Sequence, residues 1–499
     1  MSVTPTTGAD ADRLRELGYE QELRRGLRGF DNVVVGFAAI SPVVALYGVV
    51  VVGMAVAGGA WLWMLPVALA GQCLLLAVYA ELASEFPVAN GAYQWSRRLV
   101  GPRYGWFNGW VVLCAYAAAN TTIAYLGAPW ALVTFGVEPT ANAIVVTGVV
   151  LVVVCALVNA RGVVVLRRFL TAGIAAEVAA TVGVGVVLLL AFREQDVTVL
   201  TETFGAEALS GGSTAAAMLA ALAVAGWVFI GFDACGLTSE ETVDAARHVP
   251  RAVWTALLLV AALVILNAVA VALAHPDPAA VAAGGDADPV GTAVASSFGG
   301  WSERPFAALT LVAFLSCGMA AQGITARAIF SVARDGVLPA SGFLRSVDRR
   351  GVPVGATIVT AVLACLGLLL GLHSAAIGSL IAFGTAGIYG AFLLVATAAL
   401  VARLTGRWRP SGGVRLGRWG VAINLLAVAW LAFETVNIAW PRSAIAPPGA
   451  PWYQVWAAPL LLLVIAAAGA AYMAAARPWR RVPSTPAPGG RSSAPAAAE

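Results

Sequence analysis

Two apolar stretches of the chain decide its fold, and the first reads VVVGFAAISPVVALYGVV at residues 33–50. A stretch of this length can begin a membrane crossing, but Pro42 lacks a backbone donor and its ring clashes with the preceding helical turn. Gly36 and Ser41 tolerate or support an opening of the helix beside it. We therefore predict a discontinuity near residues 38–41.

The second stretch reads AVAGWVFIGFDACGLTSEE at residues 223–241 and is interrupted in a different way. Gly226, Gly231 and Gly236 recur every five residues, and the acidic Asp233 is embedded in the apolar run. Glycine weakens the interior of a helix because it has the most backbone freedom to lose. The pattern predicts a second weak helix.

The composition of the whole chain indicates a membrane domain around these two stretches. The 499 residues are 60% hydrophobic and 11% charged, whereas soluble domains are about 45–50% apolar and about 25% charged. About 20 apolar residues make one helical crossing of the hydrocarbon core. Twelve crossings are predicted, near residues 32–57, 61–82, 104–133, 142–160, 169–192, 213–238, 252–274, 304–332, 352–372, 375–402, 416–438 and 452–475.

The two interrupted helices are the first and the sixth crossing, which are corresponding positions in two halves of five. A single helix that contains Pro or Gly is equally well explained by a simple kink. Matched interruptions in both halves are instead typical of an inverted repeat with a binding site at the bilayer midplane. We expect an all-α membrane fold with five-plus-five crossings and two extra helices.

Such a pair of breaks also indicates the kind of ligand. A broken helix leaves unpaired N–H groups at the start of one half and unpaired carbonyls at the end of another. In a low-dielectric site these groups suit a carboxylate and an ammonium, so a zwitterionic amino acid is the natural ligand. A plain amine could use the carbonyl side alone.

The arginines predict how the chain is oriented. All 30 basic residues are arginine. If the N-terminus is inside, the outer loops carry only Arg193, Arg304 and Arg442, and the other 27 arginines lie inside. This asymmetry predicts that both termini are cytoplasmic.

The chain is expected to have four parts. Residues 1–29 lack the apolar core of a signal peptide and are expected to be a retained cytoplasmic tail. Residues 30–402 form the inverted-repeat core, and residues 403–477 hold crossings 11 and 12. Residues 478–499 are expected to be a disordered cytoplasmic tail, because Pro, Ser, Ala and Gly dominate them.

Metal chemistry and hydrolysis are disfavoured by the sequence. The three histidines are scattered, and the cysteines lie far apart in apolar segments without a CxxC pair. We expect no metal, no cofactor and no enzyme activity. The six cysteines are Cys73, Cys114, Cys155, Cys235, Cys317 and Cys365.

Four stretches resemble the amino acid, polyamine and organocation permease superfamily, and more closely its amino acid and choline branch. They are ISPVVALYG at 40–48, ELASEFPVANGAYQWSRRLVGP at 81–102, WVFIGFDACGLTSEETVDAARHVPRAV at 227–253 and RAIFSVARDGVLP at 327–339. The resemblance covers about residues 30–475 and implies a leucine-transporter-like fold and secondary transport. One departure is Asn90, where the family usually has a second glycine, in a loop expected to be remote from the ligand.

The resemblance implies which residues would bind the substrate. Trp227 would cover it, and Asn120 would contact it from the third crossing. Ordinary packing for Trp227 and an interhelical hydrogen bond for Asn120 are the alternatives. The backbone groups implied for the ammonium are those of Phe229, Ile230 and Gly231, and those for the carboxylate are those of Ala39, Ile40 and Ser41.

Two acidic residues inside crossings are candidates for coupling. Asp233 matches an acidic position of the family motif, with a structural pairing as the alternative. Glu177 is expected near the middle of the fifth crossing, where burial would let it load and release a proton. Its alternative is a carboxyl hydrogen-bonded within the bundle, and for Glu434 on the eleventh crossing a structural role is favoured.

Other candidates concern the inner gate and sodium. Glu240, Glu241 and Arg334 are expected at cytoplasmic helix ends, either as a gate ion pair or as a solvated cluster. Sodium coupling would need hydroxyls such as Ser316 and Thr325 on the eighth crossing, which is thin support, so proton symport or exchange is preferred.

The sequence therefore predicts a permease of the cell membrane for an amino acid or a related small amine. Its expected partners are this substrate, a coupling proton and the lipid bilayer, and nucleic acid is not among them. A sensor on the same scaffold, which binds without transporting, is the alternative. The substrate's identity, the direction of transport and the oligomeric state are left open.

Overall fold

The computed structural model describes residues 8–372, 374–443, 445–446 and 450–481. The stretch 482–499, for which disorder is expected, lies outside the described residues. Within them the chain is helical, and its single β-bridge joins Leu27 to Thr242. The all-α fold expected from the sequence is confirmed.

Eleven helical segments of the described chain are long and apolar enough to cross a membrane. The sixth expected crossing is represented by the shorter apolar helix α11 (Thr214–Val228) and, after a gap, by α12 (Ala234–Leu237). Counted with this broken helix, twelve crossings follow one another in the order expected.

The remaining helices have the following bounds. The first half holds α1 (Gly8–Glu16), α2 (Gly29–Ile40), α3 (Pro42–Tyr47), α4 (Val50–Ala57), α5 (Met64–Glu85), α6 (Gly91–Leu99), α7 (Pro102–Phe135), α8 (Ala141–Asn159), α9 (Val163–Val178) and α10 (Gly185–Ala191). The second half and the extra helices are α13 (Ala245–Ala274), α14 (Pro278–Ala282), α15 (Pro289–Phe298), α16 (Glu303–Arg334), α17 (Ser341–Leu344), α18 (Val354–Leu368), α19 (Ser374–Leu404), α20 (Gly420–Ala439), α21 (Trp452–Val455) and α22 (Ala457–Ala476).

Several helices extend beyond the apolar segments that the sequence marks. The fifth crossing was expected from residue 169 but begins at Val163, and the seventh was expected from 252 but begins at Ala245. An apolar composition identifies only the part of a helix that lies in lipid. The helix itself continues into water as long as its backbone hydrogen bonds are made. The short helices α14 and α15 were not expected. Each begins at an Asp-Pro pair, in which the aspartate accepts a backbone N–H and the proline is preset for the first turn.

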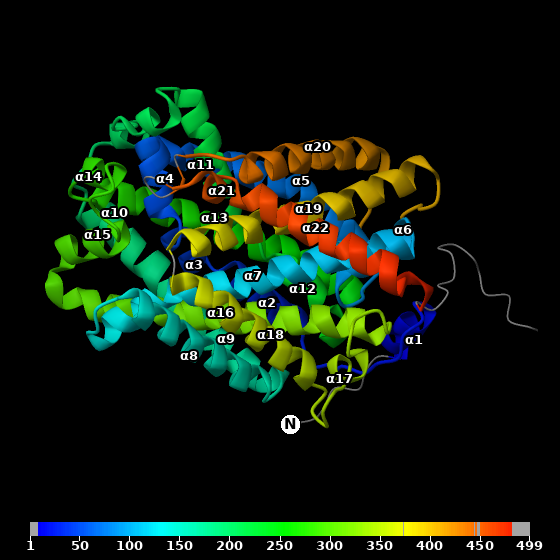
Figure 1. Cartoon of the computed structure of the whole chain (residues 1–499). Coiled ribbons are helices and arrows are strands. Elements are labelled where there is room, and N and C mark those ends of the chain that lie inside the picture. The colour runs from blue at the N-terminus through cyan, green and yellow to red at the C-terminus, as the bar shows by residue number, and fades with distance from the viewer. Residues whose placement is uncertain (1–7, 373, 444, 447–449, 482–499) are drawn as a thin grey trace, which may run out of the picture.

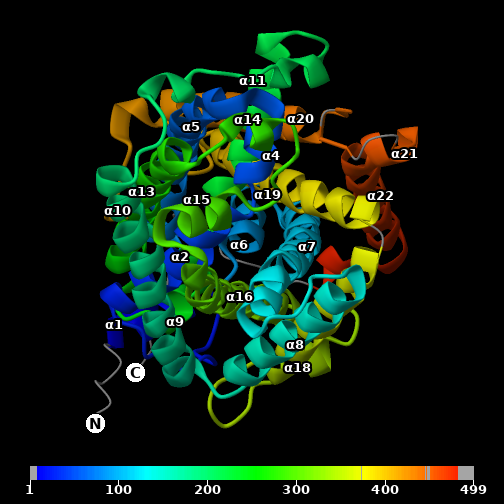
Figure 2. The ribbon, with the colours of Figure 1, turned by 90° about the vertical axis from the view of Figure 1, so that its left-hand side faces the viewer.

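The long helices lie side by side along the bundle in Figure 1, with α10, α14 and α15 at one end and α1, α6 and α17 at the other. Seen from the first end, α7 and α16 run through the middle, and α8, α18, α20 and α22 lie outside them (Figure 2). The segments of α7 and α16 are two-thirds buried, whereas only 11% of the α22 segment is buried. The first and tenth crossings are buried at least as fully, so the core is built from the first, third, eighth and tenth crossings.

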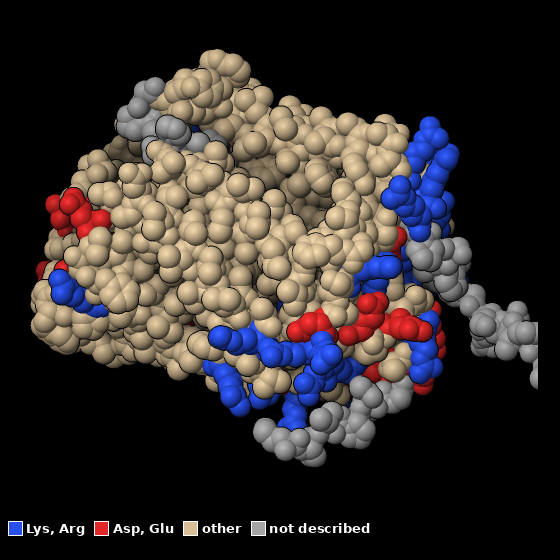
Figure 3. All heavy atoms as spheres, turned by 60° about the horizontal axis from the view of Figure 1, so that its bottom comes forward, with Lys and Arg blue, Asp and Glu red and all other residues tan. Residues whose placement is uncertain are grey.

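On the face shown in Figure 3, charged side chains gather mainly at the end with α1, α6 and α17, and the flank between the ends is nearly free of them. We call this end, which carries the connecting segments 86–90, 238–244 and 335–353, the arginine-rich end. An uncharged flank is what a hydrocarbon environment requires.

Candidate functional site

The break in the first crossing lies at Ser41, between α2 and α3. Ser41 has a positive φ of 51°, and its backbone N–H still donates to the Phe37 carbonyl at 2.8 Å. Its hydroxyl accepts a hydrogen bond from the Val44 N–H at 3.2 Å, so Ser41 caps the helix that Pro42 starts. The interruption predicted from Pro42 is thus present.

The break in the sixth crossing covers Phe229 to Gly231, where Gly231 has a φ of 99°. A Cβ atom on Gly231 would lie 2.8 Å from the carbonyl oxygen of Ala39. Only glycine fits both this backbone angle and this close approach. The two breaks therefore meet backbone to backbone in the middle of the bundle.

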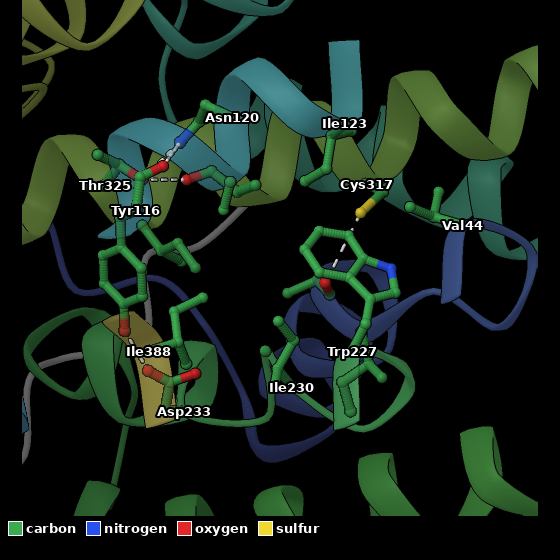
Figure 4. A pocket seen from close by; sticks show the side chains of 16 residues that line it. Val44, Tyr116, Asn120, Ile123, Trp227, Ile230, Asp233, Cys317, Thr325 and Ile388 are labelled. Carbon is green, nitrogen blue, oxygen red and sulfur yellow. Dashed lines mark hydrogen bonds between the residues drawn. The ribbon is translucent and has the colours of Figure 1, made fainter. Parts of the chain in front are cut away.

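A cavity of about 50 Å³ lies beside this meeting point. Side chains of α7 and α16 close it opposite the breaks (Figure 4), and Ile388 of α19 also lines it. It is lined by Ala39, Ile40, Val44, Tyr116, Ala119, Asn120, Ile123, Trp227, Ile230, Gly231, Asp233, Cys317, Ala321, Ile324, Thr325 and Ile388.

The polar groups of the cavity gather at one side. The Tyr116 hydroxyl points at the Asp233 carboxylate and donates a hydrogen bond to it (Figure 4). The Asn120 amide donates to the Thr325 hydroxyl and to the Tyr116 carbonyl, both at 2.8 Å. Asn120 thus lines the cavity and also makes the interhelical hydrogen bond that was its alternative interpretation.

The other side of the cavity is apolar. The Trp227 ring lies near Cys317, whose thiol reaches the Ala39 carbonyl at 3.6 Å (Figure 4). Val44 and Ile123 complete this wall. A ligand would meet hydroxyl, amide and carboxyl groups at one side and a hydrocarbon surface at the other.

Sequence reasoning missed Tyr116, Thr325, Cys317 and Ile388 as lining residues. A signal was available for Tyr116, since it precedes Asn120 by four residues and therefore shares its helix face. Thr325 was considered only as a sodium ligand.

Two of the proposed binding residues, Ser41 and Phe229, and the candidate sodium ligand Ser316 lie outside the cavity wall. Ser41 and Phe229 are fully buried behind it, although Ile40 and Ile230 line it. Ser316 is buried on α16, and its hydroxyl has no hydrogen-bond partner in the described part of the chain.

Glu177 is fully buried on α9, directly before a π-helical turn at Ala179–Val184. Neither carboxylate oxygen has a hydrogen bond of good geometry to a described residue, and the Ser41 hydroxyl lies close by. One turn earlier, Gly173 leaves room for Ser316 of α16, where any larger residue would clash. Glu177 therefore lies behind the break in the first crossing, and π-helical turns often occur at functional sites.

Ion pairs join the sixth and eighth crossings at the arginine-rich end. Arg334 binds Glu240 through two hydrogen bonds of 2.8 and 2.9 Å. Arg327 binds Glu241 in the same two-pronged way. All four residues are largely buried, so the expected Glu240, Glu241 and Arg334 group is a set of pairs and not a solvated cluster.

The tail that precedes α2 covers these pairs. The Tyr19 hydroxyl donates to Asp335 at 2.9 Å, and the Tyr19 ring lies 4.0 Å from the Arg334 guanidinium. Arg97 also binds Asp335, at 2.7 Å. Burial and the charge of Asp335 raise the pKa of the Tyr19 phenol to about 12.

The backbone of the tail is tied to the sixth crossing as well. The N–H groups of Gly26 and Leu27 donate to the Glu241 carbonyl at 3.0 and 2.9 Å, and the Val243 N–H donates to the Leu27 carbonyl at 2.9 Å. The tail thus forms an isolated β-bridge, between Leu27 and Thr242, with the chain that follows α12.

A multi-pass helical bundle whose first and sixth crossings break around a central cavity is the inverted-repeat class of membrane transport protein. The family described as amino acid permease matches residues 33–468. The chain belongs to this amino acid permease family, within the amino acid, polyamine and organocation superfamily.

Relatives span most of the chain. It is 27% identical to the amino-acid permease BAT1 of Arabidopsis thaliana over 88% of this chain and 90% of that protein. It is 29% identical to the vacuolar cationic amino acid transporter 2 of the same plant, over 65% of this chain and 51% of the relative. It is also 23% identical to the thiamine transporter thi9 of Schizosaccharomyces pombe, over 78% of this chain and 73% of that protein.

Proposed function

We propose that this protein carries an amino acid or a related small amine across the cell membrane by alternating access. The observation that supports the proposal most directly is the contact of two broken helices, at Ser41 and Gly231, beside one buried cavity. Broken helices expose the backbone groups that can bind both ends of a zwitterion. The names of most relatives point to the same cargo class.

In this proposal the cargo binds across the two breaks. Its carboxylate lies at residues 39–41, and its ammonium lies at the backbone of residues 229–231. Trp227 covers its side chain, and Asn120 contacts it from α7. Tyr116 and Asp233, which are hydrogen-bonded to each other, close the polar side of the cavity.

Coupling is proposed to run through Glu177. A buried carboxyl without a good partner is costly to ionise, so it favours the protonated state until water reaches it. When the bundle rearranges and the break at Ser41 moves, the water access of Glu177 changes with it. This favours proton symport or exchange over uncoupled passage.

The arginine-rich end is proposed to be cytoplasmic, with both termini there, because arginine is retained on the inner side of bacterial and eukaryotic cell membranes. The ion pairs Arg334–Glu240 and Arg327–Glu241, covered by the tail, then form a closed inner gate. Opening toward the cytoplasm requires these pairs to separate.

Transport into proteoliposomes tests the proposal. Purified protein in vesicles, with a panel of radiolabelled amino acids and amines, should accumulate or exchange at least one of them, and an inward proton gradient should increase its uptake. Empty vesicles prepared in parallel are the control. Saturable binding without accumulation or exchange would instead indicate a sensor, and no binding by any member of the panel would contradict the substrate class.

A further inference from the structure

The end of α11 at the break of the sixth crossing has an unusual backbone arrangement. In a continuing helix the Ile230 N–H would donate to the Gly226 carbonyl, four residues earlier. Here the Ile230 N–H reaches the Trp227 carbonyl at 3.5 Å instead. The Gly226 carbonyl is thereby left without its helical partner in a buried region, directly before Trp227.

A side chain of α19 supplies the missing partner. The Tyr389 hydroxyl donates to the Gly226 carbonyl at 3.1 Å. The same hydroxyl accepts a hydrogen bond from the Gln72 amide of α5 at 2.6 Å. Gln72 and Tyr389 are both fully buried, so this relay from the second crossing through the tenth to the sixth is shielded from water.

The next turn of α19 holds the other side of the break. Phe392, three residues after Tyr389, packs on Phe232 with ring centroids 5.3 Å apart. Tyr79 of α5 contacts both of these rings, at 5.8 and 5.5 Å. One face of α19 thus contacts the chain both before and after Gly231, and the neighbouring Ile388 lines the cavity.

We propose that Tyr389, oriented by Gln72, is a positioning residue of the transport site: it caps the broken end of α11 and so fixes Trp227 over the cavity. The transport test of this role rests on the proposed function. The role gives Tyr389 a part in cargo binding although Tyr389 does not touch the cargo. Glu434 of α20 lies on the same side, since a Cβ on Gly226 would be 3.3 Å from both its Oε1 and the Tyr389 hydroxyl.

The test uses Tyr389→Phe, with Tyr104→Phe as its matched control. Tyr104 also donates from a crossing helix to a backbone carbonyl, that of Leu394 at 2.7 Å, but away from both breaks. We expect Tyr389→Phe to raise the KM of the transported amino acid about tenfold, as loss of a buried hydrogen bond would, and Tyr104→Phe to leave it within about twofold. Equal effects in the two variants, or a wild-type KM in Tyr389→Phe, would overturn the proposal.

A double-mutant cycle tests the relay. If Gln72 acts through Tyr389, the KM effects of Gln72→Leu and Tyr389→Phe should not add, whereas those of Gln72→Leu and Tyr104→Phe should add. A Gln72→Leu effect that adds fully to that of Tyr389→Phe would contradict a shared action on Gly226.

A second readout does not need transport. The experiment uses protein in which Cys317 is the only cysteine. Cys317 lines the cavity beside Trp227 and is 1% exposed, so the rate at which a membrane-permeant maleimide labels it reports access to the cavity. Tyr389→Phe should label several times faster than the parent, and Tyr104→Phe at the parent rate. If the protein transports no amino acid and Tyr389→Phe still labels faster than the parent, the positioning role is supported and the proposed cargo is refuted. Unchanged labelling in Tyr389→Phe would refute the positioning role itself.

Discussion

Asn120 is the residue at which binding and structure are hardest to separate, because it lines the cavity and also bonds Thr325 of α16. An interhelical hydrogen bond within a membrane contributes only about 0.6 kcal/mol on average. Its loss alone would therefore change the stability of the bundle little. A large loss of transport on substitution would report contact with the cargo.

We predict that Asn120→Ala and Trp227→Ala each raise the KM about tenfold, and that Asn120→Ala shifts the thermal unfolding midpoint by no more than a few degrees. Uptake kinetics and thermal unfolding of the same preparations measure this. The matched control is Asn424→Ala, since Asn424 is also buried and donates to the Ala396 carbonyl, and neither residue lines the cavity. Wild-type kinetics in the two variants would remove both residues from the site.

Glu177 offers a second prediction at this scale. Glu177→Gln keeps the shape of the side chain but cannot release a proton. We expect uptake driven by a proton gradient to fall at least tenfold, while exchange of internal for external cargo continues. The ratio of gradient-driven uptake to exchange is the measurement. Gradient-driven accumulation at the wild-type level in Glu177→Gln would mean that the proton binds elsewhere.

Single residues also show where sequence reasoning succeeds and where it stops. Pro42 and Gly231 act on their own backbone, so the breaks they cause could be predicted locally. The pairing of Tyr116 with Asp233 could not, because it depends on how α7 packs against the chain before α12. Asn90, the departure from the family pattern, has a φ of 54°, which Asn adopts more readily than most residues in place of glycine.

At the scale of elements, the tail of residues 8–28 is the feature that composition described least well. Its lack of an apolar core indicated only a retained cytoplasmic segment, yet Tyr19 and the β-bridge at Leu27 attach it to three parts of the arginine-rich end. A polar segment is placed by individual ion pairs and hydrogen bonds, which hydropathy does not detect. The crossings are placed by burial, which hydropathy does detect.

We predict that Tyr19→Ala loosens this tail. Trypsin cleavage after the arginines of the tail should become at least several-fold faster than in the wild type. Electrophoresis of the cleaved chain measures the rate. Tyr453→Ala, at an exposed tyrosine of α21, is the control and should cleave at the wild-type rate. Protection that persists in Tyr19→Ala would show that the backbone contacts at Leu27 alone hold the tail.

The pH dependence of the Tyr19 contact follows from the raised pKa of its phenol. The protonated form is favoured in the folded state, so the stabilisation is complete below the unfolded pKa of about 10 and is lost as the pH rises toward about 12. Wild-type protection from trypsin should therefore be unchanged between pH 7 and 9. A loss of protection in that range would assign the docking to a different group.

At the scale of the whole molecule, the uneven distribution of arginine and the uncharged flank define how the bundle lies in a bilayer (Figure 3). The number and order of crossings could be predicted because each must satisfy its backbone within lipid. The bounds were less accurate wherever a helix continues into water. For the cavity, the sequence could predict only that two breaks meet. The residues of the cavity wall could not be predicted, because they come from five crossings.

Orientation can be tested with two new cysteines in protein whose native cysteines are replaced. Ser346→Cys lies at the arginine-rich end and Ser296→Cys on α15 at the other, and both positions are exposed. In intact cells a membrane-impermeant maleimide should label only Ser296→Cys, and Ser346→Cys should react after the membrane is opened. The reverse pattern would place the termini outside.

Where the two breaks meet, no side chain lies between them, since Gly231 approaches the Ala39 carbonyl directly. A contact between main-chain atoms does not depend on the identity of the side chains around it. Under the proposed function, Ile123, Thr325 or Ile388 could be replaced to fit a bulkier or more polar cargo without altering the contact between the two breaks. Redesign of selectivity should therefore begin with these wall positions and leave the glycine untouched.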